Sequence, residues 1–328
     1  MASIIVGIGV GTHRIQAGSL LVAVDKGYFA KQGLDVKLIE TGGRRESIPR
    51  IARDELDVSP QGMSVEFFSA WDPHRPLLMV ADHGSPASSP NSQGGGGIVA
   101  RPELVEKGQL RDFADLRGKR IGLSPIRGDH DRRTFAEALR RGGLTFDDVE
   151  VVISDFGQTR HKALAEETID LSTVSQPRSI VAGRESGAFV VWKHGHEVET
   201  RGRQGRTVMF SHRFYTERPD EAQRYVVAHL QGVRDYHNAF EHGINRDEVI
   251  DILANQGGLS REMVANEVVP VVVNPDGYIN LESIGEDLEW YMGEGALPAP
   301  ISINQFVDHR YVEAALVELG RYQPPLAS

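Results

Sequence analysis

Cysteine is absent from the 328-residue sequence. The chain can therefore form no disulfide, offer no thiolate to a metal ion and use no cysteine as a nucleophile. A serine nucleophile has no recognisable setting either, because the sequence contains no G-x-S-x-G motif. A cysteine-free composition suits an exported protein, although it does not require export.

Positive charge is also scarce. The 36 Lys and Arg residues stand against 46 Asp and Glu residues, which gives a formal net charge of -10. Nucleic-acid binding needs a concentrated basic surface, so we expect no nucleic-acid partner. Apolar runs are short, and none approaches the roughly 18 residues that a membrane-spanning helix needs. We therefore expect no membrane insertion.

The amino end has none of the features of a secretory leader. Residues 1–3 lead directly into an apolar stretch, without a basic region or a long apolar region before it. We expect either a periplasmic or otherwise extracytoplasmic protein whose leader has been removed, or a cytoplasmic protein.

What the sequence does contain is a regular alternation of short apolar strands and helices. The first part predicts strands at 4–10, 35–40, 56–59 and 77–82. Helical patterns separate them, at 18–30, around 48–52 and at 63–70. This alternation predicts an α/β fold with a largely parallel sheet, in which ligands bind at the carboxyl ends of the strands.

The glycine- and serine-rich stretch 84–97 is the clearest change in composition. It is either a flexible linker or a loop at the rim of a cleft, just before the chain crosses to a second lobe. The α/β pattern then repeats, with strands predicted at 98–101, 120–123, 149–154, 171–174 and 189–192. A second crossing is expected within 193–206 and a further strand at 208–211.

The last third is helical in pattern, with helices predicted at 222–240, 246–255, 261–267, 281–293 and 311–319. A chain of this length is better divided into two lobes than packed around one core. We predict that residues 1–97 begin lobe one, residues 98–195 form lobe two, and residues 196–328 return to lobe one with the C-terminal helices.

The stretch 115–144 links the predicted fold to a predicted chemistry. A strand at 120–123 leads through the polar loop 124–131 into a helix at 132–141. Unpaired N–H groups at a helix start can bind a carboxylate, sulfonate or phosphate. The alternative interpretation is an ordinary strand–loop–helix unit with a solvated basic turn.

Three segments in this order resemble a known family: GYFAKQGLDVKLIE at 27–40, DLRGKRIGLS at 115–124 and GGLTFDDVEVV at 142–152. The chain resembles the periplasmic-type substrate-binding proteins of nitrate, sulfonate and taurine ABC importers, including relatives that handle thiamine-pyrimidine precursors. The resemblance implies a type 2 periplasmic-binding-protein-like fold. In that fold two lobes, each with a mostly parallel sheet flanked by helices, close on a small and often anionic molecule.

The resemblance also implies where the ligand binds, namely on loops at strand ends. Mapped onto this sequence, the expected ligand contacts are His13, Arg14, Gly42, Gly43, Gln61, Gly62, Asp82, His83, Ser124, Arg127, Gly128, Gln158, Thr159, Ser175, Gln176 and Arg178. An ABC importer permease is the implied protein partner. Arg14, Arg44, Arg127 and Arg178 on such loops favour an anionic ligand, because a guanidinium binds carboxylates and sulfonates well.

Departures from the family leave an enzyme as the alternative. The stretch 166–180 has Leu171 where the family commonly has alanine, and it includes an arginine-bearing loop. Similar desulfinases use a cysteine and similar pyrimidine synthases a cysteine-rich motif, both of which this chain lacks. Similar decarboxylases are not excluded by that lack. The alternative is therefore a cytoplasmic, cysteine-independent lyase or hydrolase acting on a carboxylated aromatic acid, with His13, His83 and His130 as its catalytic residues.

No cofactor or metal is expected. The H-x-H pair of His194 and His196 could supply two metal ligands, but no third ligand is near in the sequence. Gly7, Gly9 and Gly11 follow a strand without the spacing of a dinucleotide-binding loop, and only Glu40 could serve as its acidic residue.

Overall fold

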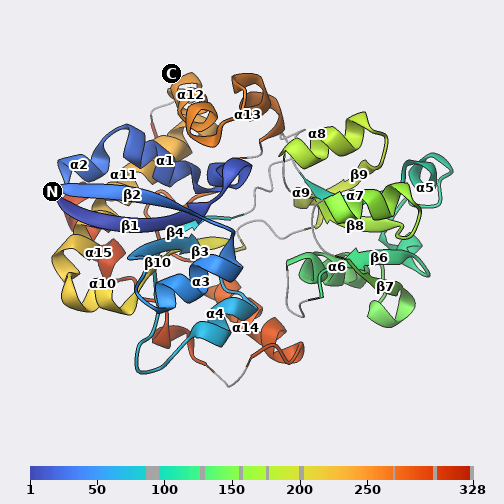
Figure 1. Cartoon of the computed structure of the whole chain (residues 1–328), viewed down its shortest axis with the longest axis horizontal. Helices are drawn as coiled ribbons and strands as arrows, with labels where there is room; N and C mark the ends of the chain where they lie inside the picture. Colours follow the sequence, from blue (N-terminus) through green and yellow to red (C-terminus); the bar gives the residue numbers. More distant parts are fainter. Residues whose placement is uncertain are drawn as a thin grey trace.

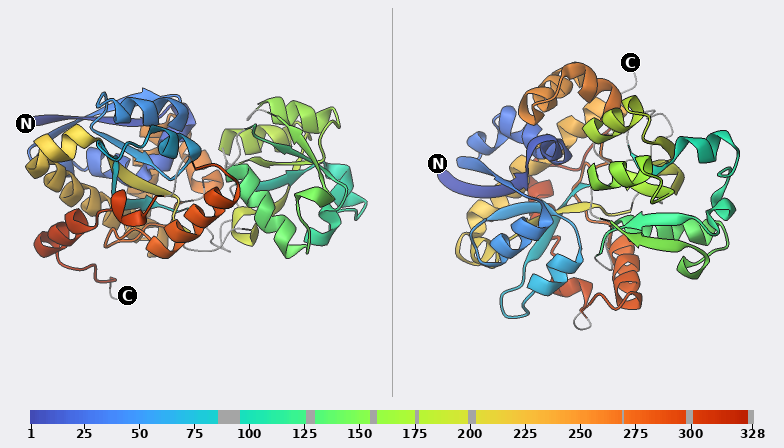
Figure 2. Two further views of the ribbon diagram at one scale, coloured as in Figure 1. Left: turned by 90° about the horizontal axis from the view of Figure 1, so that it is seen from below. Right: turned by 45° about the vertical axis from the view of Figure 1, so that its right-hand side comes forward.

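The computed structural model describes residues 1–85, 96–125, 130–154, 158–174, 177–198, 203–268, 270–297 and 301–325. Within these residues the strands form two five-stranded sheets, each flanked by helices (Figure 1). The first sheet holds the N-terminal strands and one late strand, and the second holds the middle of the chain. The C-terminal helices lie with the N-terminal strands, which confirms the predicted two-lobed α/β fold (Figures 1 and 2).

The sheet of the first lobe has the strand order β2-β1-β3-β10-β4. Its strands are β1 (Ala2–Gly9), β2 (Leu34–Thr41), β3 (Val58–Gln61), β4 (Leu78–Gly84) and β10 (Arg206–Phe210). Strand β1 is parallel to β2 and β3, whereas β10 is antiparallel to β3 and β4. Strands β1 to β4 therefore share a direction, and their carboxyl ends lie at the same edge as the first residue of β10.

The sheet of the second lobe has the order β7-β6-β8-β5-β9. Its strands are β5 (Gly97–Ala100), β6 (Arg120–Leu123), β7 (Glu150–Ile153), β8 (Leu171–Val174) and β9 (Val190–His194). Strand β5 is antiparallel to β8 and β9, and β6 is parallel to β7 and β8. The carboxyl ends of β6 to β9 thus share an edge with the start of β5. Both crossings between the lobes connect these two edges, because β4 precedes β5 and β9 precedes β10.

Two apolar clusters lie on opposite faces of the first sheet. One contains Val80 and Val208 and packs against α1 (Gly18–Asp25), α11 (Pro219–Glu241) and α15 (Arg310–Leu319). The other contains the neighbouring residues Met79 and Met209 and packs against α3 (Arg44–Ala52), α4 (Val65–Ala70) and α14 (Leu281–Gly293). Successive strand residues point to opposite faces, so β4 and β10 each contribute to both clusters.

The second lobe has a smaller core, divided in the same way. Helix α6 (His130–Arg141) packs on one cluster, and α7 (Gln158–Ala165) and α8 (Pro177–Glu185) pack on the other. The remaining helices are α2 (Tyr28–Lys31), α5 (Pro102–Glu106), α9 (Gly195–Val198), α10 (His212–Glu217), α12 (Arg246–Gly257) and α13 (Arg261–Glu267), with short 3-10 helices η1 (Gly11–Ala17), η2 (Phe113–Leu116), η3 (Phe146–Asp148) and η4 (Ile303–Gln305). No helix in the described part of the chain is both long enough and apolar enough to cross a bilayer.

The helix predicted at 18–30 is wrong in one respect, because the structure divides it. Helix α1 ends at Asp25 and α2 begins at Tyr28. Gly27 between them has a φ of 70°, a left-handed conformation that glycine adopts without strain and that a continuous helix does not contain. Gly33, between α2 and β2, also has a φ of 70°, as is common for a glycine that follows a helix.

Among the described residues, ion pairs join the two lobes between α6 and α14 and between α8 and α13. In the α6–α14 contact, Arg132 Nε donates to Glu294 Oε2 at 2.6 Å, and Arg133 pairs with Asp287. In the α8–α13 contact, Arg184 pairs with Glu267 at 2.8 Å. In these ion pairs lobe two meets helices that return late in the chain.

Candidate ligand-binding site

We call the edge of the first sheet where β1 to β4 end and β10 begins the lobe-one edge. It brings together residues that the sequence predicts at the ends of separate strands. Gly42 and Gly43 follow β2, Gln61 ends β3 and Gly62 follows it, and Asp82 and His83 lie near the end of β4. Because β1 to β4 share a direction, the fold places these positions at one edge, as the sequence predicts.

The loop after β2 contains two glycines, and carboxylates bind the N–H and guanidinium groups at its end. Gly43 precedes α3 with a φ of 98°, in the region that favours glycine. The Gly42 N–H donates to Glu46 Oε2 at 2.7 Å. Arg44 and Arg45 reach Glu66 at 3.2 and 3.7 Å. The two guanidinium groups at this helix start thus share a protein carboxylate.

Gly62 allows two backbone segments to approach closely. A Cβ atom at this position would lie 2.1 Å from the carbonyl oxygen of Gly205, just before β10. The neighbouring Gln61 turns toward α3, where its Nε2 donates to Ser47 Oγ at 2.8 Å. Gly62 therefore lets the second crossing enter the sheet directly beside the end of β3.

Replacing Gly62 by alanine should lower the free energy of unfolding by about 1–3 kcal/mol, because backbone must move to admit the methyl group. Urea unfolding measures this loss. Gly293→Ala is the matched control, since a Cβ there meets nothing within 4 Å and alanine favours a helix. Equal stability of the two variants would contradict the close-approach role.

Asp82 is a buried carboxylate that joins three segments at the base of the crossings. One of its oxygens accepts hydrogen bonds from Gln204 Nε2 at 2.6 Å and from the Gly84 N–H at 3.0 Å. The other accepts from the Asn274 N–H at 2.7 Å. Burial nevertheless raises the pKa of Asp82 to about 6. Asp82 thus organises both crossings and the segment around Asn274, rather than presenting a free carboxylate.

His83 lies beside Asp82 and stacks on His229 of α11, with ring centroids 5.3 Å apart. His229 Nε2 donates to the Asp82 carbonyl oxygen at 3.0 Å, and burial lowers the pKa of His229 to about 4. Burial, with His229 and Arg206 as smaller causes, holds the pKa of His83 well below its usual value. Both imidazoles are therefore neutral at pH 7. Neither ring nitrogen of His83 has a hydrogen-bond partner among the described residues.

Two of the arginines predicted to contact the ligand, Arg14 and Arg178, bind other protein groups in the structure. Arg14 in η1 pairs with Glu40 at 3.2 Å. Arg178, expected on a loop, lies in the first turn of α8, where Pro177 is the first residue, and donates to the Gly258 carbonyl oxygen at 2.8 Å. Arg178 therefore joins lobe two to α12 of lobe one. Arg127 lies outside the described residues.

The lobe-two edge is the edge of the second sheet where β6 to β9 end and β5 begins. A buried ion pair lies beneath this edge. Asp131 and Arg160 are each 1% exposed and pair with each other. Asp131 Oδ2 also accepts from the Ser124 N–H at 2.7 Å, after β6. Arg160 donates to the Ser154 carbonyl oxygen after β7 and to Thr173 Oγ1 in β8, both at 3.3 Å. One ion pair thus fixes the ends of three strands, and it positions Ser124, which was predicted from the sequence.

The other predicted residues of lobe two are placed only in part. Thr159 is exposed in the first turn of α7, and His130 is exposed at the start of α6, with its Nδ1 3.5 Å from Thr134 Oγ1. Gly128, Ser175 and Gln176 lie outside the described residues, as do the side chains of His13 and Gln158.

Metal binding gains no support from the described residues. The rings of His194 and His196 stack with centroids 5.6 Å apart, but no group of three or more His, Cys, Asp or Glu residues in the described ranges could hold a metal ion.

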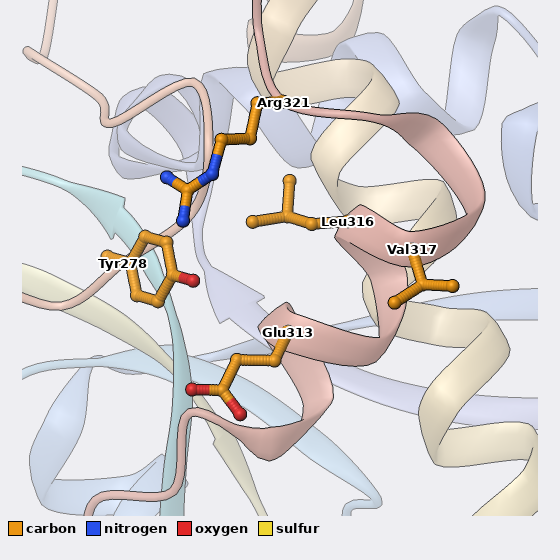
Figure 3. Close-up of a pocket in the computed structure, with 5 residues that line it drawn as sticks. All are labelled: Tyr278, Glu313, Leu316, Val317 and Arg321. Atoms are coloured by element: carbon orange, nitrogen blue, oxygen red, sulfur yellow. The ribbon is translucent and has the colours of Figure 1, made fainter.

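A surface hollow of about 370 Å³ lies beside α15 (Figure 3). Its lining residues are Tyr278, Glu313, Leu316, Val317 and Arg321. Val317 is 89% exposed, so the hollow is open to solvent. The described lining contains none of the predicted ligand contacts, and the hollow is therefore separate from the candidate site.

Two α/β lobes, joined by two crossings between their strand-end edges, define the periplasmic-binding-protein type of fold. The description "NMT1/THI5 like" belongs to the family whose profile matches residues 15–82 and 99–241. The chain belongs to this NMT1/THI5-like family. A comparison with curated proteins gave no match.

Solved structures share the fold at low sequence identity. A putative periplasmic sulfonate-binding protein SsuA from Methylobacillus flagellatus KT is 18% identical, with a TM-score of 0.71 over 100% of this chain and 98% of that chain. The periplasmic nitrate-binding protein NrtA from Synechocystis PCC 6803 is 13% identical, with a TM-score of 0.70 over 98% of this chain and 89% of that one. The desulfurization enzyme DSZB is 14% identical, with a TM-score of 0.66 over 97% and 100% of the two chains.

The site predicted from the sequence does not include Arg206, which lies at the lobe-one edge, or Asp131 and Arg160, which lie beneath the lobe-two edge. Arg206 begins an antiparallel strand, so it reaches the lobe-one edge from the opposite direction to the loops considered. The signal that could have found it is an arginine directly before the apolar run of β10. Asp131 and Arg160 are separated by 29 positions, and nothing local in the sequence pairs them.

Proposed function

We propose that the protein is a substrate-binding protein that closes on a small organic anion, a carboxylate or a sulfonate, and delivers it to an ABC-type importer. The observation that carries this proposal is the pair of strand-end edges connected by both crossings. Each edge carries polar side chains, with Gln61 on lobe one and Ser124 and Thr159 on lobe two. Membership of the NMT1/THI5-like family supports the proposal. The sulfonate- and nitrate-binding proteins that share the fold support it as well.

The lobes proposed to move against each other are residues 1–97 with 196–328, and residues 98–195. Closure would turn the two edges toward a shared ligand and shield it from water. The α6–α14 and α8–α13 contacts and the Arg178–Gly258 hydrogen bond are described interactions between lobes that such a motion must make or break. An importer permease is the proposed partner, and a periplasmic or equivalent location is the proposed compartment, because the related binding proteins above are described as periplasmic.

The proposed ligand contacts are the strand-end residues predicted from the sequence. Of these, the lobe-one edge holds Gly42, Gly43, Gln61 and Gly62, and the lobe-two edge holds Ser124 and Thr159. Asp82 and His83 support this surface from within, since both are buried.

A thermal-shift screen tests the function. A ligand that binds only the folded protein raises the melting temperature by mass action. We expect stabilisation by carboxylates or sulfonates and none by amines of similar size. Stabilisation by amines alone, or by no small molecule, would contradict the proposal. Each stabilising compound is then incubated with the protein and its products are analysed.

Product analysis also tests the second candidate, a cysteine-independent lyase or hydrolase on the same fold. The specific observation in its favour is the similarity to the enzyme DSZB, which has a TM-score of 0.66. Decarboxylation or hydrolysis of a stabilising acid at a rate proportional to protein concentration would replace the binding function by the enzymatic one. Unchanged acid after prolonged incubation supports binding alone.

A further inference from the structure

Arg206 differs from Arg14 and Arg44 at the lobe-one edge because no carboxylate of a described residue pairs with it. Its guanidinium donates to the Gln16 carbonyl oxygen at 3.3 Å and to Gln16 Oε1. No Asp or Glu in the described ranges forms an ion pair with it, whereas Arg14 has Glu40 and Arg44 has Glu66. Within the described ranges, Arg206 is thus a cation whose guanidinium is bound by the neutral residue Gln16.

The surroundings of Arg206 add further positive or neutral groups. Burial, and to a smaller degree the charge of Arg44, lower the pKa of Arg206 to about 10. His83 lies within range of its charge, and His83 and His229 are neutral at pH 7. The guanidinium therefore remains charged at pH 7 although it is partly buried and uncompensated by its neighbours.

The position of Arg206 places its charge at the lobe-one edge, where the ligand is proposed to bind. It is the first residue of β10, paired in register with Gly84 at the end of β4, and Gln16 belongs to η1, which follows β1. The guanidinium thus lies among the ends of the strands that form the lobe-one edge. A buried charge without a partner is unfavourable, and an anion that reaches it removes this cost. A guanidinium also offers two parallel N–H groups, which fit a carboxylate or sulfonate.

We propose that Arg206 is the main cation that binds the anionic head of the ligand, and that Gln16 holds its guanidinium in position. The ligand class is an organic acid with a carboxylate or sulfonate group. This inference rests on the proposed function and deepens it, because Arg206 does not belong to the contacts predicted from the sequence.

The test uses the full chain and three probes: methanesulfonate, benzenesulfonate and benzoate. Their affinities are measured by calorimetry for the wild type, Arg206→Met and Arg206→Lys. We expect Arg206→Met to weaken the tightest probe by roughly 10- to 100-fold, as for loss of a charged hydrogen bond. Arg206→Lys should lie between, because lysine keeps the charge but loses the fork of two N–H groups.

The stability of the ligand-free protein is a second measurement. Arg206→Met should weaken binding but increase this stability. Arg206→Met should raise the urea midpoint of the ligand-free protein, because it removes an uncompensated charge. Arg234→Met is the matched control: Arg234 is 17% exposed and pairs with Asp276 at 3.3 Å, so its loss should lower the midpoint and leave probe affinity unchanged.

The outcomes separate the two proposals. Wild-type affinity in Arg206→Met would overturn the role of Arg206 and leave the binding function intact. A lower urea midpoint for Arg206→Met than for the wild type would show that the guanidinium is already compensated, and would also overturn it. Binding of a neutral or cationic compound to the wild type, with none of the three probes bound, would remove both the role of Arg206 and the anionic ligand class.

Discussion

Replacing Asp131 by alanine is expected to reduce the free energy of unfolding by about 3–5 kcal/mol, the usual cost of removing one partner from a buried ion pair. The variant removes the carboxylate with which the Arg160 guanidinium, 1% exposed, forms its buried ion pair. It also removes the acceptor of the Ser124 and Arg132 N–H groups, each of which lies 2.7 Å from an Asp131 oxygen. Urea unfolding followed by circular dichroism measures the loss.

The double variant Asp131→Ala/Arg160→Met identifies the cause. If the loss arises from an unbalanced charge, removing both partners should cost less than the two single losses added together. Glu166→Ala, one residue beyond the helix that carries Arg160, is the control, because the Lys162–Glu166 pair is 72% and 56% exposed and should contribute about 0–1 kcal/mol. Additive losses in the double variant would show that the two residues act independently.

The second large effect is a dependence of stability on pH that arises from Asp82. Its pKa is raised from an ordinary value of 3.8 to about 6 in the folded protein. Between these values the folded protein binds a proton that the unfolded chain does not bind. The contribution of Asp82 to the unfolding free energy therefore increases as the pH falls from 7 toward 4, by about 3 kcal/mol over the full range.

Comparison with Asp82→Asn isolates this contribution from that of other acids. Aspartates with lowered pKa values, such as Asp170, act in the opposite direction at low pH. The unfolding free energy of the wild type minus that of Asp82→Asn should grow by about 1.4 kcal/mol between pH 7 and pH 5. A difference that stays constant, or that shrinks as the pH falls, would contradict the raised pKa.

Asp82→Asn should also destabilise the protein at pH 7, by about 1–3 kcal/mol. Both carboxylate oxygens accept hydrogen bonds, from Gln204, Gly84 and Asn274. An asparagine amide replaces one acceptor by a donor, so at least one of these groups faces another donor.

The strands and helices were largely predictable because their signals are local. The alternation of apolar residues gave β6 and β8 with the bounds that the structure shows, and the helical period did the same for α13 and α14. The division at Gly27 was not predicted, since a glycine inside a helical pattern does not by itself reveal a left-handed conformation. Helix α8 was missed because its first turn was interpreted as part of a ligand loop.

The candidate site was predictable only where one strand end led to one loop. Gly42, Gly62 and Ser124 follow their strands directly, and parallel strands bring such loops to one edge. Arg206 depended on the direction of β10, which is set by pairing with β3 and β4 and not by any residue near it. The partners of Asp82 come from positions 84, 204 and 274, and no local pattern connects them.

The α6–α14 and α8–α13 ion pairs between the lobes differ in exposure, and this difference gives the molecule a preferred pivot. Arg133 and Asp287 of the α6–α14 contact are 16% and 6% exposed, whereas Arg184 of the α8–α13 contact is 57% exposed. Water and salt weaken the exposed pair far more than the shielded one. Thermal fluctuations should therefore separate α8 from α13 before they separate α6 from α14. The two lobes should then rotate apart about the α6–α14 contact.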